Sequence, residues 1–484
     1  MILSERLRDP FDSFWIGNYD AGFQAEFRGS SYSGPLLNLY HPEFPESWNN
    51  DGKGGFSISS VANQVKISAY SGPFKMKAGE KKTFEFAILA TPIKELDTHS
   101  QFVNRYYHNG QAPTPTQEEL DNGVKIINVH HASAPNPYIN YPFLSGDTLC
   151  AFVNRFHNEG VTVKIYYTLR ELSNSAYEIW AFRSLGTELL RDGNGGGYCW
   201  LREHLIDGYY PQWYTHFNFD TENGPSADAA LLTSAGDSRL YNYYVEGLQW
   251  LVKNIDIDGL YLDDVSFDRR TLKRMRRVMD SVKPGCMIDL HSNTGFSKGP
   301  AIQYTEFFPY IDKVWFGESF MYFQMTPENY LVESSGIPFG LTGDMLHMGG
   351  NKWLGMQYGM TVRYPWFTEG VSCDPRPVWK IWDEFGIEDS RMIGFWEDTP
   401  LVTASDPDVK VTSYLKEDGS LLVSVGNYSE KDKRVRLIFN TDRYDGCKLV
   451  APEIEDFQDA AEWNIKEVIS IASKKGLLLL VVRG

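Results

Sequence analysis

Two adjacent carboxylates, Asp263 and Asp264, carry the clearest chemical signal in the sequence. They end the run Asp258-Gly-Leu-Tyr-Leu-Asp-Asp264, whose apolar centre is typical of a buried strand. Side chains alternate along a strand, so only one of the two can face a cleft directly in regular geometry. Neighbouring carboxyl groups also separate each other's pKa values, which suits one acid and one base. The pair therefore predicts acid–base chemistry, with a helix cap or pairing with Arg269 or Arg270 as the structural alternative.

Glu318 is a second candidate acid, because it ends the aromatic run Val314-Trp-Phe-Gly-Glu318. A tryptophan wall such as Trp315 removes water from a carboxyl group and raises its pKa, as a general acid requires. A buried ion pair with an arginine is the alternative role. The predicted catalytic residues are therefore Asp263, Asp264 and Glu318.

Polar side chains follow several other predicted strands, where a purely structural sheet has no need of them. Asp289 and His291 are two residues apart, so they share one strand face and can orient ligand hydroxyls. The irregular stretch 193–214 is rich in aromatic residues and predicts a wall that faces the substrate. The predicted substrate-binding residues are His130, Tyr167, Arg170, Glu171, Trp213, Asp289, His291, Asn293, Trp315 and Asp344.

Strand-like and helical segments alternate over residues 118–395, and this order predicts the scaffold that would gather these side chains. Helices are predicted over residues 241–252 and 269–282. About eight strands alternating with helices predict a (β/α)8 barrel, whose active site lies at the carboxy ends of the strands. A doubly wound open sheet is the alternative, but no glycine-rich phosphate loop follows any strand. The predicted strands are 125–129, 163–167, 259–262, 287–290, 314–316 and 338–341, with weaker ones near 209–214 and 361–364.

The flanking segments have the pattern of all-β domains. Residues 1–112 hold alternating runs at 64–68 and 84–90 between Gly and Pro turns, and predict an N-terminal β-sandwich. Residues 400–484 predict a small C-terminal β-sandwich, with strands at 409–415, 421–425, 434–439 and 476–482. The prediction is a multidomain chain in which a TIM-type barrel over residues 118–395 lies between two β-sandwiches.

The composition limits the class of partner. The 484 residues include 46 Lys and Arg against 63 Asp and Glu, a net charge of −17 that repels phosphate backbones and argues against nucleic acid. No apolar run reaches the ~20 residues of a membrane helix, so no membrane partner is expected. The 14% aromatic content suits sugar binding. The start of the chain lacks the apolar segment of a signal peptide, so we expect a cytoplasmic protein, or an extracytoplasmic one whose leader was removed.

The cysteine and histidine patterns argue against two other kinds of site. The five cysteines are widely spaced without a CxxC motif, and no G-x-S-x-G motif is present. A metallohydrolase on a barrel would need several histidines at strand ends. His130 and His131 are adjacent and should point to opposite sides, and His291 alone joins them. The sequence predicts neither a metal site nor a cofactor, and a metal-dependent hydrolase is the weaker alternative.

Longer motifs give the chain a family resemblance. Over about residues 14–395 it resembles the family 123 glycoside hydrolases and their uncharacterised relatives, with the C-terminal sandwich in the expected place. The motifs that carry the resemblance are Trp15-Ile-Gly-Asn18, Gly22-Phe-Gln24, Ala90-Thr-Pro-Ile-Lys94, Tyr167-Thr-Leu-Arg-Glu-Leu-Ser-Asn174, Asp258-Gly-Leu-Tyr-Leu-Asp-Asp264, Ile288-Asp-Leu-His-Ser292, Trp315-Phe-Gly-Glu318 and Gly336-Ile-Pro-Phe-Gly340.

The resemblance implies a glycan substrate and a mechanism. Characterised members of the family are β-N-acetylgalactosaminidases in which the 2-acetamido oxygen of the substrate attacks the anomeric carbon. The resemblance implies that Asp263 orients the acetamido group and that Asp264 stands in the acid/base position. The family has Glu at that position, and Asp264 is one methylene shorter, which places its carboxyl group about 1.5 Å further back. Glu318 could supply the acid from across the cleft instead.

The expected function is therefore a glycoside hydrolase that cleaves a terminal glycosidic bond of a glycan by carboxylate catalysis, with substrate assistance as one form of it. A non-catalytic carbohydrate-binding protein on a barrel scaffold is the alternative, motivated by the Asp at position 264. The sequence predicts neither the sugar nor the oligomeric state.

Overall fold

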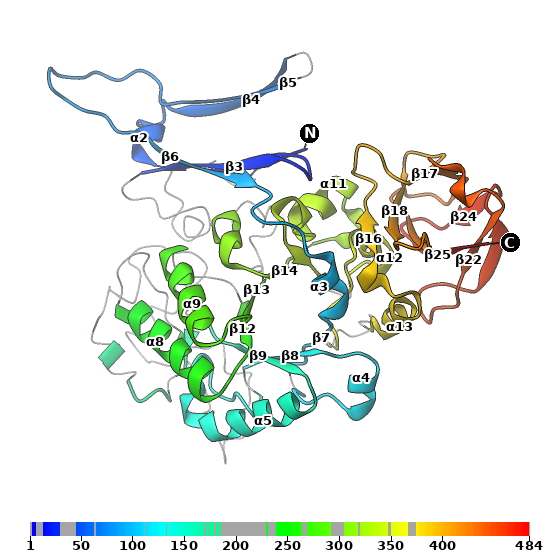
Figure 1. Ribbon diagram of the computed structural model, residues 1–484. Helices are drawn as coiled ribbons and strands as arrows, with labels where there is room; N and C mark the ends of the chain where they lie inside the picture. Colours follow the sequence, from blue (N-terminus) through cyan, green and yellow to red (C-terminus); the bar gives the residue numbers. More distant parts are fainter. Residues whose placement is uncertain are drawn as a thin grey trace.

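The computed structural model of the 484-residue chain has three parts, an N-terminal sheet, a central barrel and a C-terminal group of sheets (Figure 1). No helix in the described ranges has the length and apolar content needed to cross a membrane. The structure describes residues 2–5, 13–29, 45–61, 64–110, 112–131, 133–168, 171–173, 175–178, 181–182, 185, 229–230, 239–263, 269–291, 304–317, 320–346, 350–365 and 374–483.

Seven parallel strands form the wall of the barrel, and they stand side by side in chain order. Each neighbouring pair is parallel, so the carboxy ends of all seven strands lie at the same end of the barrel. The strands are β7 (Tyr106–Tyr107), β8 (Ile126–Val129), β9 (Thr162–Tyr166), β12 (Gly259–Asp263), β13 (Met287–His291), β14 (Lys313–Trp315) and β15 (Thr342–Gly343).

An eighth segment closes the ring. Met345 forms a parallel bridge with Val362, and the amide of Arg363 donates to the carbonyl of Met345 at 3.0 Å. On the other side, the amide of His108 donates to the carbonyl of Tyr364 at 2.6 Å, which joins the last wall segment to the end of β7. The sheet is therefore a closed (β/α)8-type barrel, and the rival open sheet is wrong.

Five predicted strands match strands of the structure, the weaker one at 361–364 corresponds to the closing segment, and the one at 338–341 is wrong. The predictions at 125–129, 163–167, 259–262, 287–290 and 314–316 correspond to β8, β9, β12, β13 and β14 within one or two residues. The segment 338–341 is mainly the 3-10 helix η7 (Ile337–Phe339), because Gly336 and Gly340 both adopt positive φ angles; the strand follows it. The segment 209–214 lies outside the described residues, so a strand there stays a prediction; in the described sheet β9 pairs directly with β12. The sequence analysis missed β7.

Helices cover the outside of the wall (Figure 1). The predictions at 241–252 and 269–282 are confirmed as α8 (Arg239–Asn254) and α9 (Arg269–Val282), and α8 buries Tyr244, Leu248 and Leu251 on one face. The remaining helices are α2 (Glu46–Asn49), α3 (Thr98–Val103), α4 (Gln117–Asp121), η1 (Pro142–Ser145), α5 (Gly146–Asn158), η4 (Thr305–Tyr310), η5 (Tyr322–Gln324), α11 (Pro327–Asn329), η6 (Tyr330–Ser334), α12 (Lys352–Gly355), η8 (Met356–Tyr358), α13 (Arg376–Phe385), η9 (Ile387–Asp389) and η10 (Asp442–Tyr444).

The N-terminal part is a four-stranded antiparallel sheet with a hairpin over one face (Figure 1). The hairpin residues Phe56, Val65 and Ile67 pack on a small core that includes Phe14 and Phe27. The sheet contains β1 (Ile2–Glu5), β2 (Ser13–Gly17), β3 (Gly22–Arg28) and β6 (Glu85–Thr91), and the hairpin contains β4 (Gly55–Val61) and β5 (Gln64–Tyr70).

Three of the resemblance motifs meet where this sheet joins the barrel. The buried Trp15 donates from Nε1 to the Thr91 hydroxyl at 3.0 Å and packs on Phe339 with ring centroids 5.6 Å apart. Gly340 has φ 76°, and a Cβ there would lie 1.8 Å from the carbonyl oxygen of Lys94. Glycine is therefore required where the two parts touch.

The C-terminal part is built from antiparallel strands that share one core, as expected for a sandwich. Val402, Val435, Leu437 and Ile469 of the small sheets pack with Val423 of the large one. The large sheet has the order β16 (Arg391–Ile393), β18 (Val409–Leu415), β19 (Leu421–Asn427), β25 (Gly476–Arg483), β22 (Cys447–Ala451) and β23 (Ala461–Asn464). The two-stranded sheets are β17 (Val402–Ala404) with β21 (Leu437–Phe439), β20 (Lys433–Val435) with β24 (Ile469–Ile471), and, beside the barrel, β10 (Glu171–Leu172) with β11 (Ala229–Ala230).

The barrel interior combines aromatic rings with buried ion pairs. Lys164 and Asp289 form an ion pair in which neither side chain is exposed. Trp315 donates to the same carboxylate at 3.1 Å, and its ring meets Tyr106 edge-on at 5.1 Å. Burial lowers the pKa of Lys164, and Asp289 opposes this shift. Each of the two buried groups is the countercharge of the other.

We predict that Lys164→Met and Asp289→Asn will each destabilise the protein by about 3–5 kcal/mol, because each leaves one buried group without its countercharge. The double variant should lose less than the more damaging single variant, since no unpaired charge remains. Denaturant unfolding of the four proteins measures the interaction energy. Additive losses in the double variant would contradict the prediction.

Candidate active site

The carboxy ends of the barrel strands bring a polar cluster together. We call the side chains of His108, His130, Tyr166, Tyr261, Asp263, His291 and Arg363 the rim cluster. The His108 ring lies 4.5 Å from the Tyr261 ring and 5.5 Å from the His130 ring, measured between centroids. These residues come from five strand ends and the closing segment, so ring closure assembles them.

Asp263 occupies the centre of the rim cluster. The Tyr166 hydroxyl donates to Oδ2 of Asp263 at 3.3 Å, and Nδ1 of His291 lies 2.7 Å from Oδ1. Its side chain is 23% exposed, whereas that of His291 is 7% exposed. Asp263 is thus held by two neighbouring strands while it keeps access to solvent, as a carboxylate that meets a ligand requires.

The two adjacent histidines do not point to opposite sides, and that prediction is wrong. The rings of His130 and His131 lie 4.3 Å apart, and both contact the Tyr166 ring, at 5.1 and 4.5 Å. Strand β8 ends at Val129, so the alternation of side chains no longer applies at these positions. Burial lowers the pKa of His130 to about 4, although the nearby Asp263 opposes the shift.

Three predicted binding residues lie in the barrel wall beneath the rim. Asp289 and Trp315 bond to each other within the buried core. Asp344 accepts from the Thr361 amide at 2.5 Å and pairs with Lys313 at 2.7 Å, so it ties β15 to the closing segment. The structure thus places Asp289, Trp315 and Asp344 among internal partners, whereas His130 and His291 stand at the rim.

Tyr167 and Tyr166 face opposite sides of the wall. The predicted residue Tyr167 stacks on Tyr244 of α8 with ring centroids 4.2 Å apart, outside the barrel. Tyr166 contacts Tyr261 and Asp263 inside it. Side chains alternate along β9, so only one of these two neighbours can face the interior, and that residue is Tyr166. The predicted residue, Tyr167, faces outward.

The other predicted residues cannot be placed. The side chains of Glu171, in β10, and of Asp264, Glu318, Arg170, Asn293 and Trp213 lie outside the described part of the chain.

Four members of the rim cluster were missed by sequence reasoning. Tyr261 precedes Asp263 by two residues, so the strand period could have identified it. Arg363 lies in the weak strand predicted at 361–364, for which no functional residue was predicted. His108 follows a two-residue strand, which is too short to give a sequence signal. Tyr166 was not among the predicted residues, although its neighbour Tyr167 was.

The rim histidines do not make a recognisable metal site. Within the described ranges, no group of three or more His, Cys, Asp or Glu side chains is arranged to hold a metal ion. Neutral imidazoles and a carboxylate are suitable ligand types, but their donor atoms do not converge here. The rim cluster is better suited to hydrogen bonding with a polar ligand.

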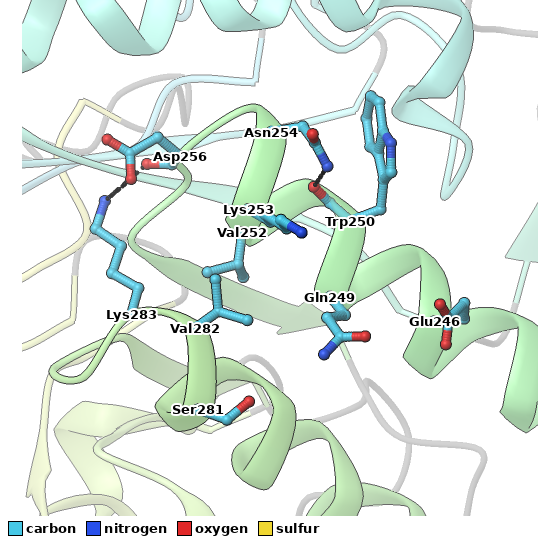
Figure 2. A pocket seen from close by; sticks show the side chains of 10 residues that line it. All are labelled: Glu246, Gln249, Trp250, Val252, Lys253, Asn254, Asp256, Ser281, Val282 and Lys283. Atoms are coloured by element: carbon cyan, nitrogen blue, oxygen red, sulfur yellow. Dashed lines mark hydrogen bonds and ion pairs between the residues drawn. The ribbon is translucent and has the colours of Figure 1, made fainter.

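Two cavities lie at the opposite end of the barrel. One has a volume of about 830 Å³ and is lined by residues that include Asn254, Asp256 and Lys283. Figure 2 shows these side chains beside the ends of α8 and α9. A second, of about 290 Å³, is lined by residues that include Asn104 and Lys313. These residues precede or begin β12, β13, β7 and β14, at the amino ends of the strands, so both cavities are remote from Asp263.

Family models match almost the whole chain. The TIM-barrel domain of glycoside hydrolase 123 matches residues 97–365. The C-terminal domain of the same family matches residues 374–482, and its third domain matches residues 5–92. These three stretches correspond to the barrel, the C-terminal sheets and the N-terminal sheet.

Solved structures with a similar fold include glycoside hydrolases. An α-amylase from Anoxybacillus has 10% identity and a TM-score of 0.51, over 79% of this chain and 99% of that one, which shows the fold alone. The maltogenic α-amylase AmyB from Thermotoga neapolitana has 12% identity and a TM-score of 0.49, over 79% and 99%. A GH27 β-L-arabinopyranosidase from Geobacillus stearothermophilus has 13% identity and a TM-score of 0.45, over 80% and 98%. No curated protein matches the chain.

The lowered pKa of His130 predicts a pH dependence of stability. The unfolded imidazole has its ordinary pKa of 6.5 and the folded one about 4, so the unfolded state binds more protons between these values. The stability contributed by neutral His130 is complete above pH 6.5 and is lost as the pH falls toward 4. The limiting slope for one proton is about 1.4 kcal/mol per pH unit.

We therefore expect His130→Gln to flatten the decline in unfolding free energy between pH 6.5 and 4.5. Denaturant unfolding at several pH values measures the slope. The exposed His99 is the control, and His99→Gln should leave the slope unchanged. Equal slopes for wild type and His130→Gln would refute the assignment.

Proposed function

The chain belongs to the glycoside hydrolase 123 family and is a glycoside hydrolase, and from this premise we propose that it cleaves a terminal glycosidic bond of a glycan by carboxylate catalysis. The observation that supports this most is the position of Asp263. It ends a central barrel strand at the rim and is partly exposed among hydrogen-bonding side chains.

In the proposed mechanism, Asp263 orients or stabilises the reacting sugar. An acidic group protonates the leaving oxygen while positive charge develops at the anomeric carbon. If the substrate carries a 2-acetamido group, Asp263 accepts a hydrogen bond from its N–H and holds the carbonyl oxygen toward that carbon. This role follows the family pattern, and the partial exposure of Asp263 supports it.

Asp264 and Glu318 are the proposed acid groups. Asp264 follows β12 directly, and Glu318 follows β14 after two residues. These strands flank β13, so at a spacing of about 4.8 Å per strand their ends lie about 10 Å apart. Two carboxyl groups that approach each other from these positions can span a glycosidic bond, for which separations of about 5–9.5 Å are used.

The shorter side chain at position 264 makes the choice of acid testable. If Asp264 is the general acid, Asp264→Asn should remove most of the activity. If Glu318 is the general acid instead, Glu318→Gln should remove most of it. Removal of a general acid lowers turnover by about 10²–10⁴-fold, with the largest effect on substrates that have poor leaving groups.

We predict that Asp263→Asn and at least one of Asp264→Asn and Glu318→Gln will lower turnover by about 10²-fold or more on glycosides whose leaving group is an alcohol or a sugar. The panel should pair each 2-acetamido sugar with its 2-hydroxy counterpart, because substrate assistance requires the acetamido group. Glu246→Gln is the matched control, since Glu246 is exposed on α8 beside the remote cavity. Activity near the wild-type value in all three variants would end the proposal.

A further inference from the structure

We propose that Tyr166 and His291 are positioning residues that fix both oxygens of the Asp263 carboxylate, and that Tyr261 and Arg363 hold His291 in place. The inference rests on the proposed function, because it explains how the carboxylate of that site is oriented.

The first argument is that the two strands that flank β12 each supply one bond to Asp263. Tyr166 of β9 donates to Oδ2 at 3.3 Å, and Nδ1 of His291, from β13, lies 2.7 Å from Oδ1. Asp263 and His291 are register partners in adjacent parallel strands. A carboxylate bonded through both oxygens from opposite sides cannot rotate about its Cβ–Cγ bond without breaking a bond.

The second argument concerns the proton on His291. An ionised carboxylate only accepts hydrogen bonds, so Nδ1 of His291 must carry the proton that it shares with Asp263. The Tyr261 hydroxyl oxygen lies 2.9 Å from the same nitrogen. Because Nδ1 carries a proton, this oxygen can accept a second, weaker hydrogen bond from Nδ1 but cannot donate one to it. Arg363 lies on the other side of that hydroxyl and donates to its oxygen at 3.4 Å. Tyr261 and Arg363 therefore hold the imidazole in one orientation.

The third argument is that these groups are buried while Asp263 is not. Tyr261, His291 and Arg363 are all buried, so they lie on the side of the carboxylate away from solvent. Such residues act on a substrate through the carboxylate. An error of 1 Å in the position of a catalytic group can cost about 10²-fold in rate, which sets the size of effect to expect.

The experiment compares two amide replacements of the imidazole. The amide nitrogen of Asn can stand at the position of Nδ1, and that of Gln can stand at the position of Nε2. If His291 positions Asp263 through Nδ1, His291→Asn should keep kcat within about tenfold of wild type, whereas His291→Gln should lose about 10²-fold with little change in KM. Tyr166→Phe and Tyr261→Phe should lower kcat by smaller factors.

Equal large losses for His291→Asn and His291→Gln would overturn the proposal, because the ring itself would then exchange a proton with substrate. Wild-type kcat in both would overturn it as well. His99→Asn and His99→Gln are the controls for the substitutions, and thermal unfolding checks that each variant folds.

A second measurement does not depend on activity and separates the inference from the proposed function. Nitrogen-15 NMR of the histidines at pH 7 should show His291 protonated on Nδ1, with a changed tautomer balance in Asp263→Asn. Among the described residues, the other titratable groups facing the pair are His108, His130, Tyr166, Tyr261 and Arg363, so the spectra should be recorded across pH 5–8 to separate their effects. A bare Nδ1 on His291 overturns the inference even in an active enzyme. An enzyme inactive on every glycoside, with Nδ1 protonated, would overturn the proposed function alone.

Discussion

The rim cluster depends on closure of the sheet into a ring. The hydrogen bond between the His108 amide and the Tyr364 carbonyl joins the first and last wall segments. Asp344 strengthens the neighbouring seam, because its carboxylate bonds to Thr361 and to Lys313. Only in a closed ring do His108 and Arg363, which are far apart in the chain, both reach Tyr261. The geometry around Asp263 is therefore a property of the whole barrel.

The barrel separates its carboxylates by depth. Asp289 and Asp344 lie one layer below the rim, where each is paired with a buried lysine. Their bonding capacity serves the packing of the interior, where an uncompensated charge would be costly. Asp263 lies two residues beyond Tyr261, which is the register partner of Asp289. There its partners are a hydroxyl and an imidazole, and part of its surface meets solvent. Depth in the barrel thus distinguishes a structural carboxylate from one that can meet a substrate.

This difference in depth marks the limit of what the sequence predicts: it identifies residues that face the interior, but not their partners. Five of the predicted strands and both helices follow from local apolar periodicity, and so does the choice of a barrel. The same periodicity identifies Asp263 and His291 as neighbours of the interior. It cannot show that Lys164, which is far from Asp289 in the sequence, forms an ion pair with it, because the packing of the barrel determines that pairing. It also fails where a strand is as short as β7 or where left-handed glycines convert a strand pattern into η7.

The electrostatics of the rim suit the proposed chemistry. Burial, with help from Arg363, lowers the pKa of His108 well below its ordinary value, and burial lowers that of His130 to about 4. Both imidazoles are therefore neutral at physiological pH, and they place no positive charge beside Asp263. Cleavage of a glycosidic bond develops positive charge on the sugar ring, which cationic side chains would oppose and a fixed carboxylate stabilises. The two neutral imidazoles lie beside one oriented carboxylate, and the Arg363 guanidinium is bonded to the Tyr261 hydroxyl. This arrangement favours that transition state over the uncharged substrate, and this difference is what accelerates a reaction.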